Sequence, residues 1–144
     1  AISAGGGRIA AGANGSTFIW DGRTGELSAR IEFGAPFRLF AFVGSQIVTV
    51  SDSEASIWQG RSERSLGRWP RSDYVRLETA GRTIAVCGER SRQGEGNHSA
   101  QSWVVVWDAA TGLELATEQE PAAQQRYCNL AISPPRTVAE DLLR

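Results

Sequence analysis

The feature that most constrains the fold is a recurring apolar run that ends in tryptophan and a polar residue and is followed by a turn. It is clearest in "VVVWDAATGLELA", and earlier copies read "FIWDGRTGELSAR" and "SIWQGRSERSLGR". The tryptophans of the three copies, Trp20, Trp58 and Trp107, are separated by 38 and 49 residues. The longer step contains a polar stretch of 11 residues, Ser91 to Gln101, which we interpret as an insertion. Without it the chain repeats about every 40 residues, a period typical of repeat architectures.

The segments around these tryptophans have the composition of short β-strands. They are rich in β-branched and aromatic residues and are separated by Gly, Asn, Asp and Ser, whereas no stretch shows a sustained helical period. The sequence therefore predicts an all-β chain in which each repeat supplies four strands. The expected strands are 8–13, 16–21, 26–33, 37–44, 46–52, 55–60, 74–80, 82–89, 102–108, 113–119 and 127–133.

Two copies of the pattern resemble the WD40 repeat, in which a strand ends in Trp-Asp and the next turn often contains Thr-Gly. They are "WDGRTGEL" and "WDAATGLEL"; the third copy, "WQGRSERSL", has Gln59 at the Asp position. "LAISPPRTVA" and "AISAGGGRIAAG" are similar to another strand junction of that family. The family's Gly-His dipeptide has no copy here, so a quinoprotein-like blade remains an alternative label.

The resemblance implies β-propeller blades, each a four-stranded antiparallel sheet. Trp20, Trp58 and Trp107 would then be the apolar anchors with which the blades pack. We expect one propeller segment over 1–144, with repeats at 1–41, 42–80 and 81–133, and with 134–144 starting the next repeat or forming a tail. Because a propeller ring usually needs four to eight blades, the three repeats are expected to be part of a larger ring. Further blades or partner proteins would complete it.

Composition excludes several functions. The net charge of −1 gives no field that would attract nucleic acid, and no apolar run approaches the length of about 18 residues that a membrane span needs. Cys87 and Cys128 form no Cys-x-x-Cys pair; two small buried side chains are the favoured interpretation, and a disulfide between them is the alternative. All basic residues are arginine, a bias that we associate with a bacterial genome.

Catalytic patterns are absent from the sequence. The single histidine has no nearby nucleophile pattern, and the glycine-rich start lacks the Lys-Ser/Thr of a phosphate-binding loop. We therefore expect no enzyme, no cofactor and no metal. A propeller enzyme of the quinoprotein or lyase type is the alternative.

Two loops are the candidate binding surface, Gly60 to Asp73 and the insertion Ser91 to Gln101. Trp69 lies in the polar stretch "GRWPRSDY". Between positions 61 and 92 the sequence contains eight arginines and four acidic residues, a local excess of positive charge. Because Arg and Trp are enriched in interface hot spots, the sequence predicts a protein-interaction scaffold or sensor module of a cytoplasmic bacterial signalling or effector assembly. The predicted contact residues are Trp69, Arg61, Arg64, Arg68, Arg71, Arg92 and His98.

Overall fold

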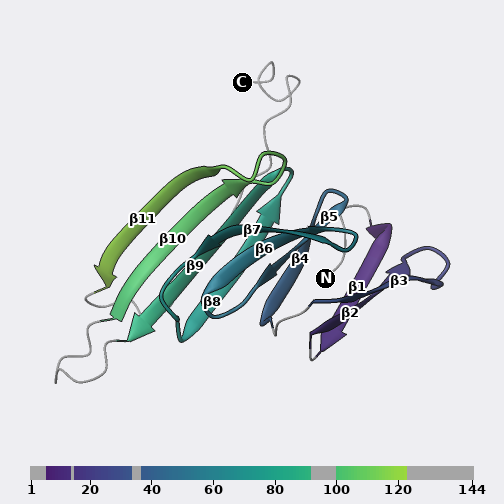
Figure 1. Ribbon diagram of the computed structural model, residues 1–144, viewed down its shortest axis with the longest axis horizontal. Coiled ribbons are helices and arrows are strands. Elements are labelled where there is room, and N and C mark those ends of the chain that lie inside the picture. The colour runs from purple at the N-terminus through teal and green to yellow at the C-terminus, as the bar shows by residue number, and fades with distance from the viewer. Residues whose placement is uncertain (1–5, 14, 34–36, 92–99, 123–144) are drawn as a thin grey trace, which may run out of the picture.

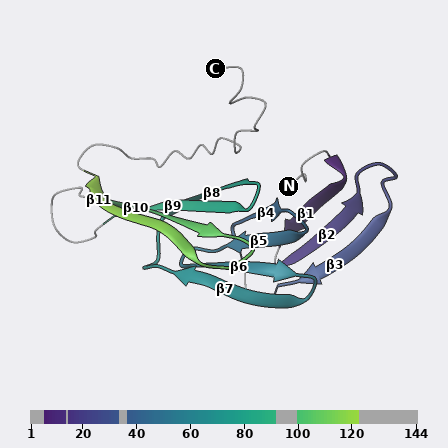
Figure 2. The ribbon, with the colours of Figure 1, turned by 90° about the horizontal axis from the view of Figure 1, so that it is seen from above.

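The computed structural model describes residues 6–13, 15–33, 37–91 and 100–122, which form three antiparallel sheets lying side by side in chain order (Figures 1 and 2). The expected all-β class is confirmed. Within each sheet, strands adjacent in sequence are adjacent in space. The first sheet consists of β1 (Arg8–Ala13), β2 (Ser16–Asp21) and β3 (Leu27–Glu32); the second of β4 (Leu39–Val43), β5 (Gln46–Val50), β6 (Glu54–Gln59) and β7 (Ser62–Arg68); the third of β8 (Tyr74–Ala80), β9 (Thr83–Ser91), β10 (Ala100–Asp108) and β11 (Glu114–Ala122).

The sheets are offset from the sequence repeats by one strand. β4 comes at the end of the repeat proposed for 1–41, and β8 comes at the end of the repeat proposed for 42–80. Each of these strands instead pairs with the strand that follows it. The second and third sheets therefore each take their first strand from the end of one repeat and the other three from the next.

The second sheet is buried on both faces. On one face Val48, Val50 and Ile57 pack against Ile84 and Val86 of the third sheet. Successive side chains of a strand point to opposite faces, so the neighbouring positions form a second cluster. That cluster joins Phe42, Ile47 and Trp58 of the second sheet to Ala10, Ile19 and Ile31 of the first. Because full burial of one such aliphatic side chain is worth roughly 1.5–3 kcal/mol, these two clusters hold the three sheets together.

The two strong copies of the repeat fold into the same turn. The Asp21 carboxylate accepts hydrogen bonds from the backbone N–H groups of Arg23 and Thr24 at 2.8 and 2.9 Å. The Asp108 carboxylate accepts them from the corresponding residues, Ala110 and Thr111, at 2.8 and 3.2 Å. In each turn the glycine after Thr has a positive φ, 75° at the first and 72° at the second. The residues Asp, Thr and Gly of the pattern thus each have a local structural reason.

The weak copy behaves differently, and the expected loop from Gly60 to Asp73 is wrong because it contains strand β7. Gln59 pairs with Ser62, so the hairpin closes in two residues, and Gly60 takes a φ of 61°. β7 is an edge strand whose side chains are mostly exposed; Leu66 alone among them is apolar and packs on the core. An edge strand need not alternate apolar with polar residues, and for that reason the periodicity failed to show it.

Part of the expected pattern falls outside the described residues. The strand at 127–133 and residues 92–99 of the insertion lie there, whereas Ser91, Ala100 and Gln101 extend β9 and β10. Cys87 is buried and disulfide-bonded; Cys128 lies outside the described residues. In the described part of the chain, no helix is long and apolar enough to cross a membrane.

Candidate binding groove between the second and third sheets

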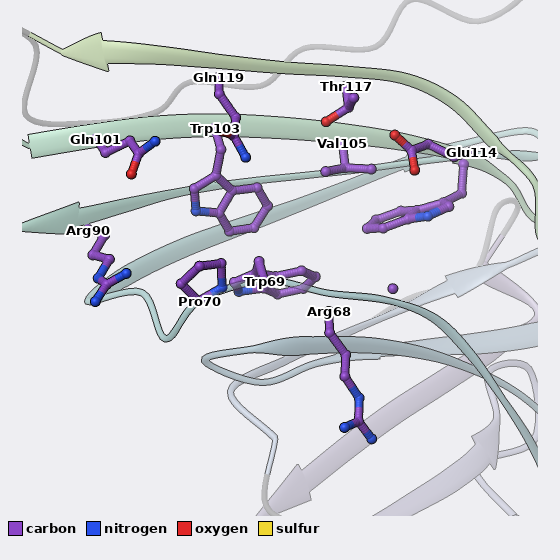
Figure 3. A pocket seen from close by; sticks show the side chains of 12 residues that line it. Arg68, Trp69, Pro70, Arg90, Gln101, Trp103, Val105, Glu114, Thr117 and Gln119 are labelled. Atoms are coloured by element: carbon purple, nitrogen blue, oxygen red, sulfur yellow. The ribbon is translucent and has the colours of Figure 1, made fainter.

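A groove of about 260 Å³ runs between the end of β7 and the face formed by β10 and β11 (Figure 3). We call it the Trp69 groove. Its centre is aromatic and its rim is polar. The lining residues are Gly67, Arg68, Trp69, Pro70, Arg90, Gln101, Trp103, Val105, Trp107, Glu114, Thr117 and Gln119.

Trp69 is held in a defined position although it follows the last strand of its sheet. Its Nε1 donates to the carbonyl of Asp52 at 2.8 Å, and its backbone N–H donates to the carbonyl of Ser53 at 2.9 Å. Its ring lies against that of Trp103, with a centroid separation of 4.6 Å. The side chain is half-buried. Trp69 therefore offers part of an oriented indole to the groove at little further entropic cost.

The two tryptophans of β10 form the floor. Trp103 and Trp107 are 8% and 2% exposed, and Trp103 Nε1 donates to Ser72 Oγ at 2.9 Å. Gly88 is opposite Trp103 in the sheet, and a Cβ at Gly88 would lie 2.3 Å from Trp103 Cζ2. Only glycine leaves room for the ring there, so the floor depends on close packing at this position.

The rim carries opposite charges at its two ends, as Figure 3 shows. Arg90 pairs with Gln101, and Glu114 pairs with Trp107, so the two ends are six residue steps apart along β10. At about 3.3 Å per residue this is about 20 Å. Both side chains are exposed, and neither has an ion-pair partner among the described residues. Thr117 and Gln119 lie between them.

The arginines predicted as one contact cluster are in fact divided. Arg68 lines the groove, but its Nε lies 3.5 Å from a carboxylate oxygen of Glu54, and Figure 3 shows its head directed away from the indoles. Arg71 is outside the groove, with its Nε 3.4 Å from a carboxylate oxygen of Asp52.

Arg64 and Arg61 have other surroundings. Arg64 donates to the carbonyl of Ala109 at 3.1 Å and so ties β7 to the turn before β11. Arg61 lines a separate cavity of about 440 Å³ between the first two sheets, together with Arg8 and Arg30. Arg92 and His98 lie outside the described residues. Among the predicted contact residues that the structure describes, Trp69 and Arg68 alone line the same groove.

Sequence reasoning missed most of the groove. Trp103, Val105 and Trp107 alternate along β10, and this period of two indicated one shared face. Arg90, Glu114 and Gln119 carried no such signal, because they reach the groove through pairing between strands.

The lining of the groove holds three ionisable side chains, Arg68, Arg90 and Glu114. Among its lining side chains the one carboxylate is Glu114, and there is no histidine or cysteine. The described residues hold no cluster of three or more His, Cys, Asp or Glu that could bind a metal ion. Burial raises the pKa of the Glu89 carboxyl, but its neighbour Gly88 is the residue on the groove face of β9, so Glu89 points to the other side.

Each sheet contains one tryptophan of the repeated pattern. We call the face of the sheet on which this tryptophan lies the leading face. Trp58 packs towards the first sheet and is 8% exposed, and Trp107 packs towards the second sheet and is 2% exposed. The equivalent Trp20 is only half-buried, and its partners in register, Ile9 and Leu27, are 38% and 57% exposed. No sheet of the described part covers this first leading face.

Two solved structures share the fold. The WD40 domain of Neurospora crassa Pan2 is 18% identical over 81% of this chain and 37% of that chain, with a TM-score of 0.53. The N-terminal domain of Nup159 is 11% identical over 83% of this chain and 32% of that chain, with a TM-score of 0.51. This chain thus spans about a third of the length of either structure. Comparisons of the sequence with protein-family models and with curated proteins give no match. The structural likeness confirms WD40-like propeller blades, as the sequence resemblance predicted.

Proposed function

We propose that the three consecutive WD40-like blades form a protein-interaction module. This scaffold or sensor region would bind a protein partner through the Trp69 groove. The observation that carries the proposal is the half-open indole of Trp69, anchored by hydrogen bonds and flanked by two exposed charges without ion-pair partners in the described chain. Trp and Arg are the residue types most enriched in binding hot spots. Ordered aromatic side chains also lose little entropy on binding.

The alternative, a propeller enzyme of the quinoprotein or lyase type, has less support. General acid–base catalysis needs a titratable group within reach of the reacting atom, commonly with a second group to complete the proton transfer. The Trp69 groove has a single carboxylate at one rim. The proposal is therefore a binding role without a cofactor.

The leading face of the first sheet supports a larger assembly. Ile9, Trp20 and Leu27 form an apolar surface at the place where the other two sheets receive a neighbour. We propose that a further blade, from the same protein or from a partner, covers it. A bacterial, cytoplasmic signalling or effector setting rests on the sequence alone, and the disulfide-bonded Cys87 counts against the cytosol, where disulfides are rare.

The experiment that tests the function is site-specific crosslinking in cells of the source organism. A photoreactive residue at Gln119 lies in the groove, whereas one at Ala116, also exposed on β11, lies outside it. We expect a protein captured from position 119 and not from 116. Equal capture from both positions, or none from either, contradicts the groove as the binding surface.

A matched pair of variants then tests the captured partner in purified form. Thr117→Tyr places a bulky ring in the groove, and Ala116→Tyr places the same ring outside it. The first should weaken binding by about tenfold or more, as expected when a hot-spot pocket is blocked, and the second should leave it unchanged.

A further inference from the structure

We infer that the Trp69 groove takes an extended peptide segment with a large apolar or aromatic side chain in its middle, a carboxylate near Arg90 and a base near Glu114. This inference rests on the proposed function and specifies the chemistry of the partner. It follows from three properties of the groove: its size, its aromatic centre and the position of its charges.

Size favours one side chain of a longer segment over a small molecule. Small-molecule pockets are usually about 300–1,000 Å³ and enclose most of their ligand. The Trp69 groove, at about 260 Å³, is smaller and lies open between two sheets. A single large side chain fits it, while the rest of the partner continues along the rim.

The centre selects an apolar or aromatic side chain. Trp69 is half-buried, Val105 is half-buried and Pro70 is exposed, so together they present an apolar surface that a partner would remove from water. Trp69 Nε1 already donates to Asp52, and Trp103 Nε1 donates to Ser72. These two indoles therefore have no N–H left for a polar ligand, so contact with the rings of Trp69 and Trp103 is apolar or aromatic.

The charges select the ends of the segment. Arg68 is committed to Glu54, which leaves Arg90 as the groove's cation without an ion-pair partner in the described chain. Glu114 lies about six strand residues away, and an extended peptide advances by the same 3.3 Å per residue. A segment of about six residues therefore reaches from one charge to the other, with its central side chain over the indoles.

The same charges disfavour a nucleic acid. Single strands bind basic grooves in which aromatic rings stack on successive bases. Here Glu114 would repel phosphate at one end, and the chain as a whole has a net charge of −1.

The test uses four synthetic peptides of equal length and with Gly/Ser spacers: acid–Phe–base, acid–Ala–base, base–Phe–base and acid–Phe–acid. Each is titrated against the full chain, with tryptophan fluorescence as the signal. We expect acid–Phe–base to bind most tightly and the Ala version about tenfold more weakly, since hot-spot side chains dominate peptide affinity. Each wrong charge should cost about threefold at low salt, and this difference should vanish at high salt.

Charge reversal provides the sharper test. Arg90→Glu should change the preference to base–Phe–base, and Glu114→Arg should change it to acid–Phe–acid; both residues are exposed, so the fold is expected to persist. Arg23→Glu is the control, because it makes the same charge change at an exposed residue of the first sheet's turn. It should leave all four affinities unchanged.

Several outcomes overturn the inference. They are equal binding of all four peptides, binding of none, preferences that ignore the two reversals, or tighter binding of an oligouridine of similar length. In one case any of these outcomes occurs, but a photoreactive residue at position 119 still captures a protein and Thr117→Tyr weakens the binding of that protein. The interaction function then stands, and the peptide chemistry is wrong. If the crosslinking fails as well, both are wrong.

Discussion

The leading faces of the first and third sheets have the same local sequence pattern and different surroundings. Trp20 and Trp107 each precede an Asp whose carboxylate closes the same turn. Trp107 is 2% exposed because the second sheet packs on it, whereas Trp20 is half-buried beside the exposed Ile9 and Leu27. The comparison shows that the repeat pattern specifies the turn and the position of the ring. Burial of that ring depends on a neighbouring sheet.

The largest expected effect tests this difference directly. Trp107→Ala should lower the free energy of unfolding by about 4 kcal/mol, because it leaves a cavity between two sheets, and Trp20→Ala by about 1 kcal/mol, because its ring is already half in water. Urea unfolding of the full chain measures both. If the two losses are equal, the first leading face is covered in solution as the third is.

The next effect concerns the close packing of glycines against the tryptophans on the covered leading face of the third sheet. Gly88→Ala should cost about 3 kcal/mol, because its Cβ would lie 2.3 Å from Trp103 Cζ2 and displace a buried ring. Gly67→Ala is the milder counterpart at about 1 kcal/mol, since its Cβ would lie 3.1 Å from Trp107 Cζ2. Thermal or urea unfolding compares them. A neutral Gly88→Ala contradicts the close packing of Gly88 against Trp103.

A smaller effect comes from the hydrogen bond beneath the groove. Ser72→Ala leaves the buried Nε1 of Trp103 without its acceptor and should cost about 1–2 kcal/mol. Ser65→Ala is the control, because its hydroxyl donates to Glu54 on an exposed part of the second sheet. It should be close to neutral in the same unfolding assay. A neutral Ser72→Ala would instead indicate that Trp103 finds another partner.

The smallest effect on stability concerns the Asp turn, of which the first and third sheets each contain a copy. Hydrogen bonds from the backbone N–H groups of Thr24 and Arg23 lower the pKa of Asp21 below its ordinary value of 3.8. For Asp108, burial acts to raise the pKa, whereas backbone hydrogen bonds from Ala110 and Thr111 act to lower it. The ion pair with Arg82 acts in the same direction, so the pKa of Asp108 is lowered as well.

The sign of the pH dependence follows from these shifts. A carboxylate with a lowered folded-state pKa stabilises the fold above its unfolded pKa, and this stabilisation is lost as pH falls through the folded pKa. Unfolding measured from neutral pH to below 3.8 should therefore show stability falling on the acid side. Asp21→Asn and Asp108→Asn should each reduce that slope. A variant with an unchanged slope would contradict the role of its carboxylate in the turn.

Local chemistry accounts for what could be predicted from the sequence. The strands expected at 8–13 and 16–21 have those bounds in the structure, and the Asp-x-x-Thr-Gly turns form as the pattern indicates. These features depend on residues within a few positions of one another. β7 was missed because an exposed edge strand needs no apolar alternation, and its pairing partner β6 supplies the order instead.

The candidate site was only partly predictable for the same physical reason. The sequence marked Trp69 as an unusual aromatic residue in a polar stretch, but it also grouped with it arginines that the fold directs elsewhere. Arg90 and Glu114 come from different strands, and register with β10 alone places them at the two ends of the groove. Short-range preferences act along the chain and can be read from it. The groove and the burial of its tryptophans arise between sheets, where contacts join residues that are distant in sequence.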